Sequence, residues 1–386
     1  MLTPTTANPD IQRPVLAVAM LALGGIVWAA GEAGGTRLAL AALVGGCAGL
    51  ALYHASFGFT SAWRRFARER RGAGLRAQLA MIALTVLISY PLIAHGHAFG
   101  MPTYGWVLPF GVAAAFGAFI FGIGMQLGGG CASGTLFTVG GGSTRMVITL
   151  SAFIAGSVIA TAHLPEWRTL PAIPPVSSIS SLGVIGALAL TFALLAFIAR
   201  VTVIAEKRQH GDLEAPRETG SVLTGPWSLM FGAVAIAFVG IATFLVLGRP
   251  WGITSAFALW GAKVASGIGI PIETWPHWAG QTARLEASVF TDGTSVMNFG
   301  IIAGAMVAAA LAGRFSPSRS ITFMGVLTAV IGGLLMGYGA RLAYGCNSGA
   351  YLGGIVSGSL HGWGWLVFGY LGSLVGTRLR GVLRMD

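Results

Sequence analysis

Charged residues are scarce in this sequence. They make up 9% of its 386 residues, against about 25% in ordinary soluble domains. Hydrophobic residues reach 55%, and apolar stretches of roughly 18 to 25 residues recur along the chain. Each stretch is long enough to cross a hydrocarbon core about 30 Å thick as a helix. The composition therefore excludes a soluble globular protein and predicts an integral membrane protein.

The alternation of apolar and polar residues that is typical of membrane β-barrels is also missing. The apolar runs are continuous and rich in Ala, Leu, Gly and Ile, which predicts an all-α polytopic membrane protein with about ten transmembrane helices. The first run lacks a clear signal-peptide cleavage site, so we expect it to be retained as a span. The predicted spans lie near 14–30, 36–53, 75–95, 106–127, 144–163, 179–204, 227–248, 296–313, 320–343 and 363–381.

Cysteine is rarer still, with three residues in the chain. An odd number of cysteines in a protein stabilised by the bilayer does not imply a disulfide framework. No C-x-x-C pair or histidine lies at the spacing of a metal site, and the sequence has no phosphate-binding P-loop. We therefore expect no metal, no cofactor and no coupling to ATP within this chain.

The formal net charge of +11 does not indicate a nucleic-acid-binding protein, because the basic residues flank apolar spans. In membrane proteins such clusters mark the cytoplasmic side. Alternate crossings that start inside place all four clusters, and both termini, in the cytoplasm. The clusters lie at 61–78, 206–211, 313–320 and 377–386.

Two short motifs occur twice, in the same order. "GIGMQLGGGCASG" (122–134) matches "GYGARLAYGCNSG" (337–349), and "GFTSAW" (58–63) matches "GITSAF" (252–257). Five predicted spans intervene between the starts of the two repeats, so the second repeat must be inverted, as in many transporters. The predicted parts are an N-terminal segment with the first span (1–35), a first transport repeat with an extra span (36–205), a polar cytoplasmic linker (206–226) and a second, inverted transport repeat (227–386).

The glycine-rich cysteine motifs are poor continuous helices, because glycine costs about 1 kcal/mol relative to alanine inside a helix. We expect re-entrant loops that open short half-helices, whose N-termini attract anions. Arg341 either attracts anions at the outer mouth or extends its charge to the membrane surface. The predicted substrate pathway comprises Gly130, Cys131, Ser133, Gly134, Gly345, Cys346, Asn347, Ser348 and Gly349, with Thr60, Thr254, Arg341 and the unmatched Cys47.

The thiols indicate the kind of substrate. A thiol is a weak hydrogen-bond donor with a soft sulfur, and it suits another soft sulfur better than a hard oxyanion such as phosphate. A thiolate would repel an anion, so we expect neutral thiols along the route. Packing alone is an equally good interpretation of Cys47, and it is a weaker one for Cys131 and Cys346.

Three segments resemble the YeeE/YedE sulfur-transport family: "GGCAGLALYHASFGFTSAWR", "GGGCASGT" and "ARLAYGCNSGAYLGGIVSGSLHGWGW". The resemblance covers roughly 36–163 and 227–381. It implies an hourglass-like fold and uptake of thiosulfate across the bacterial inner membrane. It also implies that Cys47, Cys131 and Cys346 pass the ion by transient, non-covalent S–H contacts, and that a cytoplasmic TusA-like sulfur carrier is the partner.

Two alternatives stay open. The substrate is another sulfur or selenium anion, or the protein is a membrane-embedded thiol sulfurtransferase that forms a persulfide on Cys131 or Cys346. A catalytic thiol needs a neighbouring base or cation, and the sequence offers none adjacent beyond Arg341. We therefore expect a transporter and not an enzyme.

Overall fold

The computed structural model describes residues 10–217, 219–317 and 320–385. Helices dominate these residues, which confirms the predicted all-α polytopic membrane protein. Two small antiparallel pairs of strands also occur, β1 (His97–Ala98) with β2 (Met101–Pro102) and β3 (Phe110–Gly111) with β4 (Ala172–Ile173). Both chain termini and Arg319 of the predicted cluster at 313–320 lie outside the described residues.

Long helices and shorter ones are interspersed along the described chain. The long helices are α1 (Arg13–Ala55), α3 (Ala73–His95), α4 (Val112–Gly128), α6 (Thr144–Trp167), α7 (Ser178–His210), α8 (Leu229–Leu247), α11 (Gly293–Leu311), α12 (Phe323–Leu342) and α14 (Leu360–Val382). The shorter ones are α2 (Phe59–Glu69), α5 (Ala132–Gly140), α9 (Thr254–Gly267), η1 (Ile272–Thr274), α10 (Thr282–Glu286), η2 (Val289–Thr291), η3 (Asn347–Leu352) and α13 (Gly353–Ile355).

Eight helical segments within the described residues are long and apolar enough to cross a membrane. The first includes α1, which holds two of the ten predicted spans. Non-helical backbone at Gly34 and Gly35 breaks α1 between those spans. A Cβ placed on Gly46 in the second half would lie 3.2 Å from Cδ1 of Leu23 in the first, so the halves run antiparallel. The tenth predicted span coincides with α14, a glycine-rich helix that is not among the eight.

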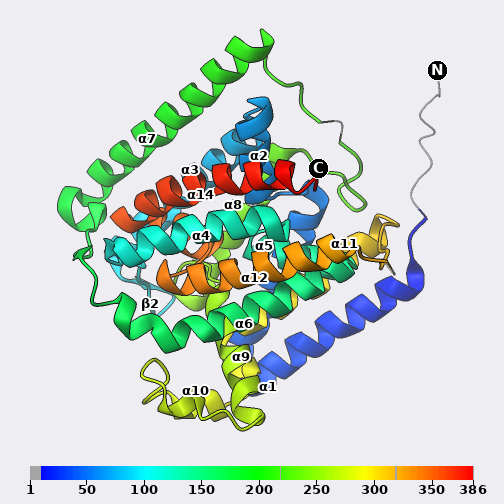
Figure 1. Cartoon of the computed structure of the whole chain (residues 1–386), viewed down its shortest axis with the longest axis vertical. Helices are drawn as coiled ribbons and strands as arrows, with labels where there is room; N and C mark the ends of the chain where they lie inside the picture. Colours follow the sequence, from blue (N-terminus) through cyan, green and yellow to red (C-terminus); the bar gives the residue numbers. More distant parts are fainter. Residues whose placement is uncertain (1–9, 218, 318–319, 386) are drawn as a thin grey trace.

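The helices before and after residue 217 are interleaved. In Figure 1, α14, α4, α12 and α6 lie side by side across the molecule. The second half of α1 packs against α11 through glycines, because Gly300 and Gly304 lie against the backbone of Ala42 and Gly46. Glycine permits such close approach of two helices in a membrane. On the other side of the molecule α3 packs against α8.

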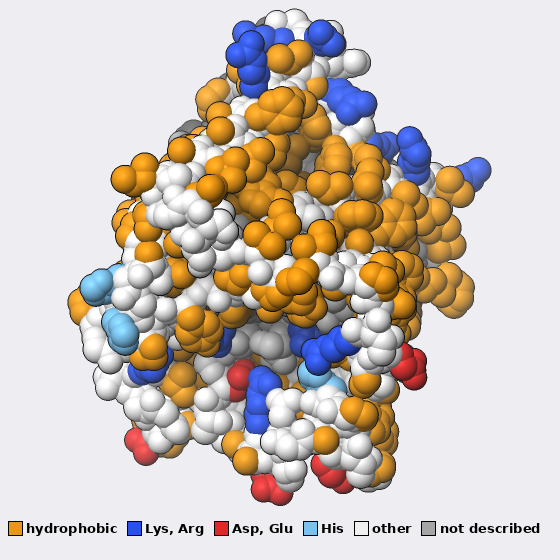
Figure 2. All heavy atoms as spheres, turned by 90° about the vertical axis from the view of Figure 1, so that its left-hand side faces the viewer, with side chains coloured by type: hydrophobic (Ala, Val, Ile, Leu, Met, Phe, Trp, Pro, Cys, Tyr) orange, Lys and Arg blue, Asp and Glu red, His pale blue; other side chains and the backbone are white. Residues whose placement is uncertain are grey.

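Hydrophobic side chains form a broad belt on the face shown in Figure 2. Lys and Arg side chains project above the belt, whereas the Asp and Glu side chains of this face lie below it, together with further basic residues. Such a belt suits the hydrocarbon core of a bilayer.

Contacts bring predicted basic clusters to one end of the molecule, hereafter the basic end. There Gln12 Nε2 donates to the Phe315 carbonyl at 3.0 Å, and Arg71 pairs with Glu206 at 3.2 Å.

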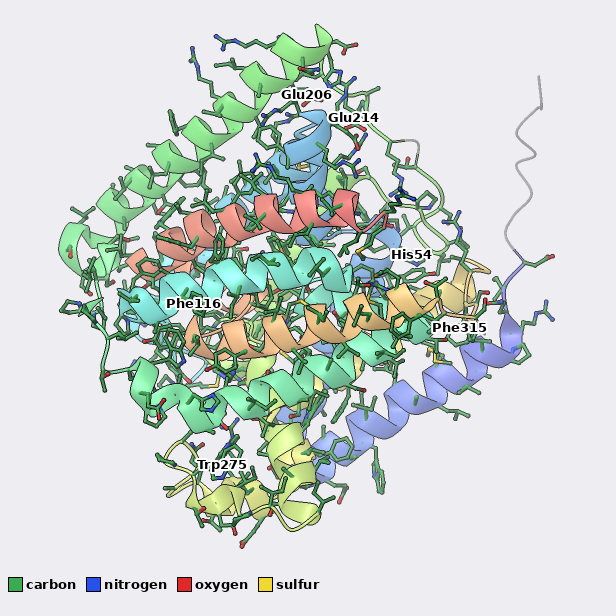
Figure 3. The ribbon with its side chains drawn as sticks, in the orientation of Figure 1. His54, Phe116, Glu206, Glu214, Trp275 and Phe315 are labelled. Carbon is green, nitrogen blue, oxygen red and sulfur yellow. The ribbon has the colours of Figure 1, made fainter. Side chains whose placement is uncertain are left out.

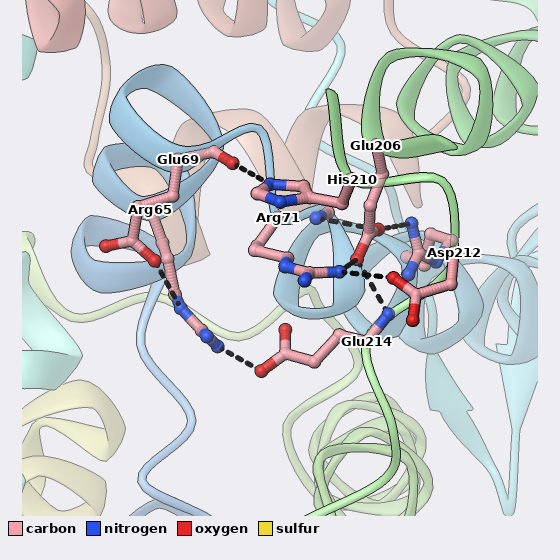
Figure 4. A network of polar contacts seen from close by, with 9 residues as sticks. Arg65, Glu69, Arg71, Glu206, His210, Asp212 and Glu214 are labelled. Carbon is pink, nitrogen blue, oxygen red and sulfur yellow. Dashed lines mark hydrogen bonds and ion pairs between the residues drawn. The ribbon is translucent and has the colours of Figure 1, made fainter. Parts of the chain in front are cut away.

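Glu206 fixes the start of the linker. Its side chain is fully buried, and burying a carboxylate is costly unless charged and polar partners surround it. Oε2 accepts from Arg76 at 2.7 Å and from the Gly72 N–H at 3.1 Å. Oε1 accepts from Arg71 and from the Glu214 N–H, which lies 2.9 Å away (Figures 3 and 4). The network ties the end of α7 and the following loop to the corner between α2 and α3.

The glycine contact between α1 and α11 yields a stability prediction. In Gly304→Ala, the added methyl group would clash with the carbonyl oxygen of Gly46. We expect a loss of about 1–3 kcal/mol of unfolding free energy, measured as thermal unfolding in detergent. Gly24→Ala is the matched control, because a Cβ on Gly24 meets no atom within 4 Å. Equal stability of the two variants would contradict the close approach.

Candidate functional site

Each of the two matched cysteines stands directly before a short helix. After α4 the chain turns through Gly129, whose φ of 91° favours glycine, and Cys131 precedes α5. After α12 the chain turns through Tyr344 and Gly345, and Cys346 precedes η3, a π-helix that continues as α13. The backbone of both cysteines is extended, with ψ of −168°. The two glycine-rich motifs therefore adopt the same local structure.

The short helices begin face to face and lead to opposite ends of the molecule. Near their N-termini, the Ser348 hydroxyl donates to the Ser133 hydroxyl at 3.4 Å. At the far end of α5, Gly140 lies against the backbone of Ile302 in α11. At the far end of α13, the Ile355 carbonyl accepts from the Tyr90 hydroxyl of α3 at 2.9 Å. This is the geometry expected of two re-entrant segments that meet inside the protein.

Breaking a helix inside a membrane leaves carbonyl groups without partners, and arginines supply them at the end of α4. Arg145 donates to the carbonyls of Gly128 at 2.9 Å and Leu127 at 2.8 Å. Arg380 donates to the carbonyl of Gln126 at 2.9 Å. Cationic donors also suit a helix C-terminus electrostatically. Neither arginine was singled out from the sequence, because their partners are distant in the chain.

Both matched thiols are buried, with exposed fractions of 1% for Cys131 and 0% for Cys346. The Cys131 sulfur lies 3.4 Å from the Ser133 hydroxyl oxygen, and backbone groups of Ser133 and Phe59 lie within its hydrogen-bonding range. The backbone of Ser348 lies within hydrogen-bonding range of the Cys346 sulfur. The first N–H groups of a helix carry partial positive charge. Each thiol is thus held among donors that favour an anion.

Asn347 carries unused hydrogen-bonding capacity at this place. Its side chain is fully buried, yet within the described residues neither its amide oxygen nor its amide nitrogen has a partner. The buried hydroxyl of Thr60 also has no hydrogen-bond partner among the described residues. An unpaired buried polar group costs about 1–3 kcal/mol, so native proteins keep such groups mainly where they serve function.

The second motif lies beside the first in both halves of the chain. Gln126, five residues before Cys131, donates to the carbonyl of Thr60 at 3.1 Å. Arg341, five residues before Cys346, donates to the hydroxyl of Thr254 at 2.9 Å. Arg341 is partly buried, its Nε is unpaired, and no acidic side chain of the described residues pairs with it. A cationic donor therefore lies near Cys346 and a neutral amide near Cys131.

Of the predicted glycines, Gly130 and Gly345 lie in the two turns, whereas Gly134 and Gly349 lie in the first turns of the short helices α5 and η3. A Cβ on Gly134 would lie 3.7 Å from the Cys131 sulfur, and one on Gly130 would lie 3.2 Å from the Gly134 backbone. Gly349 faces Gly252, with 3.9 Å between such a Cβ and the Gly252 Cα. These glycines let the backbone approach the thiols closely.

Aromatic side chains enclose the Cys346 segment, and sequence reasoning missed them. Tyr351 stacks on Trp365, with ring centroids 6.3 Å apart, and Phe59 and Trp63 meet Tyr351 edge-on. Trp365 also donates its indole N–H to the carbonyl of Gly345 at 3.3 Å. The position of Tyr351, five residues after Cys346, was the available signal in the sequence.

Cys47 does not join the buried pair. It lies in the second half of α1, and it is exposed, whereas Cys131 and Cys346 are buried. The structure therefore brings two of the three predicted cysteines to one site, and a role for Cys47 on the route stays a prediction.

Pockets lie on both sides of the pair. At the basic end a pocket of about 650 Å³ includes Gly58 and Ser61 of the "GFTSAW" motif. On the other side a pocket of about 390 Å³ includes Leu342 and Tyr344, which precede Cys346, and Arg168. Neither cysteine of the pair lines either pocket. The pair is thus closed off from both.

A family model described as "Sulphur transport" matches residues 54–375. The thiosulfate transporter TsuA of Spirochaeta thermophila is 28% identical over 288 residues, which cover 68% of this chain and 76% of that protein. The thiosulfate transporter TsuA of Escherichia coli strain K12 is 26% identical over 271 residues, which cover 68% of this chain and 72% of that protein.

The probable transporter YedE of Escherichia coli strain K12 is 30% identical over 152 residues. The match covers 39% of this chain and 37% of YedE, so the chain spans a little over a third of that relative's length.

The unpaired amide of Asn347 yields a prediction that separates binding from stability. In Asn347→Leu we expect unchanged or higher unfolding free energy, because a buried unpaired polar group is removed, and weaker binding of the substrate anion. Gln78→Leu is the control. The buried Gln78 amide accepts from Trp63 at 3.1 Å and donates to the Gly58 carbonyl at 3.4 Å, so its loss should cost about 1–3 kcal/mol. Thermal unfolding and anion titration measure both effects, and a destabilised Asn347→Leu would argue for a structural role.

Proposed function

The chain belongs to the sulphur transport family, and from this premise we propose that it takes up thiosulfate across the bacterial inner membrane. The two TsuA relatives bear the name thiosulfate transporter, and this supports the choice of substrate. The observation that carries the proposal is the buried pair, Cys131 and Cys346, each before a short helix that starts beside the other.

In the proposed route the anion passes between the thiols without covalent chemistry. Arg341 and the N-terminus of η3 attract it near Cys346, where Asn347 supplies a free amide donor. Ser348 and Ser133, already in contact, bridge the two helix starts and pass the anion toward Cys131. Neutral thiols donate weak S–H hydrogen bonds to the soft terminal sulfur, so the ion is held loosely enough to leave.

We further propose that residues 36–205 and 227–386 form two inverted transport repeats in an hourglass-like arrangement. Helix packing supports this, because a contact between a helix of one repeat and a helix of the other occurs a second time between the corresponding helices, with the two repeats exchanged. The second half of α1 packs on α11 as α8 packs on α3, and α12 packs on α6 as α4 packs on α14. The paired contacts of Gln126 with Thr60 and of Arg341 with Thr254 follow the same exchange.

The basic end is proposed to face the cytoplasm, with both chain termini on that side, because cytoplasmic loops of membrane proteins carry excess Lys and Arg. Cys346 then lies toward the outer side and Cys131 toward the inner side of the route. A cytoplasmic TusA-like sulfur carrier is proposed to receive the anion at the basic end.

The alternatives have less support. A persulfide-forming sulfurtransferase needs a base that activates the thiol. Among the described residues, the one side-chain hydrogen bond of either buried thiol is that between Cys131 and Ser133. Transport of another sulfur or selenium anion fits the same geometry. Uptake of labelled thiosulfate, sulfate, sulfite and selenite into proteoliposomes distinguishes these substrates.

Replacing either buried thiol tests the route. In Cys131→Ala and Cys346→Ala we expect thiosulfate uptake to fall about 30- to 150-fold, the effect of about 2 to 3 kcal/mol lost in the transition state. Serine should restore little, because its oxygen is harder and less polarisable than sulfur. In Cys47→Ala we expect a smaller loss, because its thiol is exposed and outside the pair. Full uptake by well-folded alanine variants of the pair would rule out the relay.

The orientation is testable by labelling in a variant without native cysteines. Arg70→Cys and Arg208→Cys lie at the basic end and should react with a membrane-impermeant reagent only from the cytoplasmic side. His97→Cys, in the loop at the opposite end of α3, should react only from outside. Opposite sidedness of Arg70 and Arg208 would overturn the proposed repeat arrangement.

A further inference from the structure

A second, smaller pocket lies at the basic end, close to the far end of α5. Its volume is about 190 Å³, a size suited to a small anion, and its lining includes Tyr53, His54, Thr224 and Arg314. Phe137 of α5 completes one wall. The pocket thus joins the end of α1, the loop before α8, the turn after α11 and the short helix that starts at Cys131.

His54 is a built part of this pocket. Its exposed fraction is 3%, and its ring packs against Trp227 with centroids 5.4 Å apart. Its carbonyl accepts from the Trp227 N–H at 2.9 Å, and Gly225, with a φ of 62°, lets the loop pass close to the ring. In Figure 3 His54 lies between the loop that carries Glu214 and the turn that carries Phe315. Its position is therefore fixed from several sides.

Two cationic or polar groups of this pocket, one nitrogen of His54 and the Arg314 guanidinium, are free to bind a ligand. The buried Nε2 of His54 has no partner within the described residues. The Arg314 side chain lies near the Tyr53 phenol, and it makes no hydrogen bond or ion pair with any of the described residues. Hydroxyl groups of Tyr53 and Thr224 add further donors. A guanidinium, an imidazole and two hydroxyls around so small a volume suit a tetrahedral oxyanion.

The larger pocket at this end is less suited to an anion, although arginines line it. Arg65 already pairs with Glu69 at 3.1 Å and with Glu214 at 2.7 Å. Arg71 is paired with Glu206. The carboxylate of Glu214 also lines that pocket and would repel an incoming anion. Arg217 also lines the larger pocket, but it shares that pocket with a carboxylate, whereas no acidic residue among those described lines the smaller one.

We propose that the pocket formed by Tyr53, His54, Thr224 and Arg314 binds a small divalent oxyanion of the thiosulfate or sulfate class, as a second anion site distinct from the cysteine pair. Its role as the place where a transported anion pauses before release rests on the proposed function. The binding itself does not, because no residue of the cysteine pair lines the pocket.

The test measures binding in a full-length variant that lacks the pair, Cys131→Ala/Cys346→Ala, purified in detergent. Titration calorimetry with thiosulfate and with sulfate should show one site that accepts both, because the pocket offers hard donors and no thiol. Adding Arg314→Gln or His54→Ala should weaken binding about tenfold or more. Arg314→Lys should retain part of the affinity.

Arg13→Gln is the matched control, because it removes one positive charge nearby, next to Gln12, which contacts Phe315. Unchanged binding in Arg13→Gln supports the site. Equal weakening by Arg13→Gln and Arg314→Gln would show general charge attraction and overturn the proposal, as would absence of binding in the variant lacking the pair. Thermal unfolding identifies any Arg314 or His54 variant that fails to fold. The milder Thr224→Val, which removes one hydroxyl of the pocket, then takes its place in the binding measurement. Failure of thiosulfate uptake by the unmodified protein would count against the proposed function and leave this binding result intact.

Discussion

A polar backbone group inside a membrane must find its partner within the protein, and the centre of this molecule depends on that constraint. The breaks in the chain after α4 and α12 free carbonyl and amide groups together. Arg145 and Arg380 bind carbonyls at the end of α4, and Trp365 binds that of Gly345. The amides at the start of the next short helices are left facing the thiols. The broken helices thus supply backbone donors at the site, to which Arg341 adds a cationic side chain.

Close packing makes these broken helices tolerable. Glycines let α1 and α11, and likewise α4, α12 and α14, approach until side chains of one helix touch the backbone of the next. The surrounding helices thereby form a rigid frame, in which aromatic rings such as Tyr351 and Trp365 fill the space around the Cys346 turn. Both thiols of the pair are buried within this frame, and such burial would strengthen the weak contacts of an anion on the proposed route.

The sequence predicts features that a local pattern encodes. Apolar runs locate the helices, and glycine next to Cys131 and Cys346 locates the two turns. Contacts between distant segments follow only from packing, so neither the arginines that bind the end of α4 nor His54 was foreseen. Cys47 shows the limit from the other side. Its neighbours Gly45 and Gly49 resemble those of a functional turn, yet they lie against the backbone of α11, and the exposed thiol keeps its role on the route as a prediction.

The interleaving of helices from before and after the linker restricts how the protein can move. Transporters that rock one rigid half against the other need an interface along which the halves separate. Here the pairs α1 with α11, α4 with α12 and α6 with α12 all join the two parts of the chain, and buried Glu206 anchors the linker besides. Rocking would pull apart the core itself. The structure therefore argues against movement of one sequence half as a rigid body against the other, and on the proposed route it favours opening by small shifts of the two turns and nearby side chains.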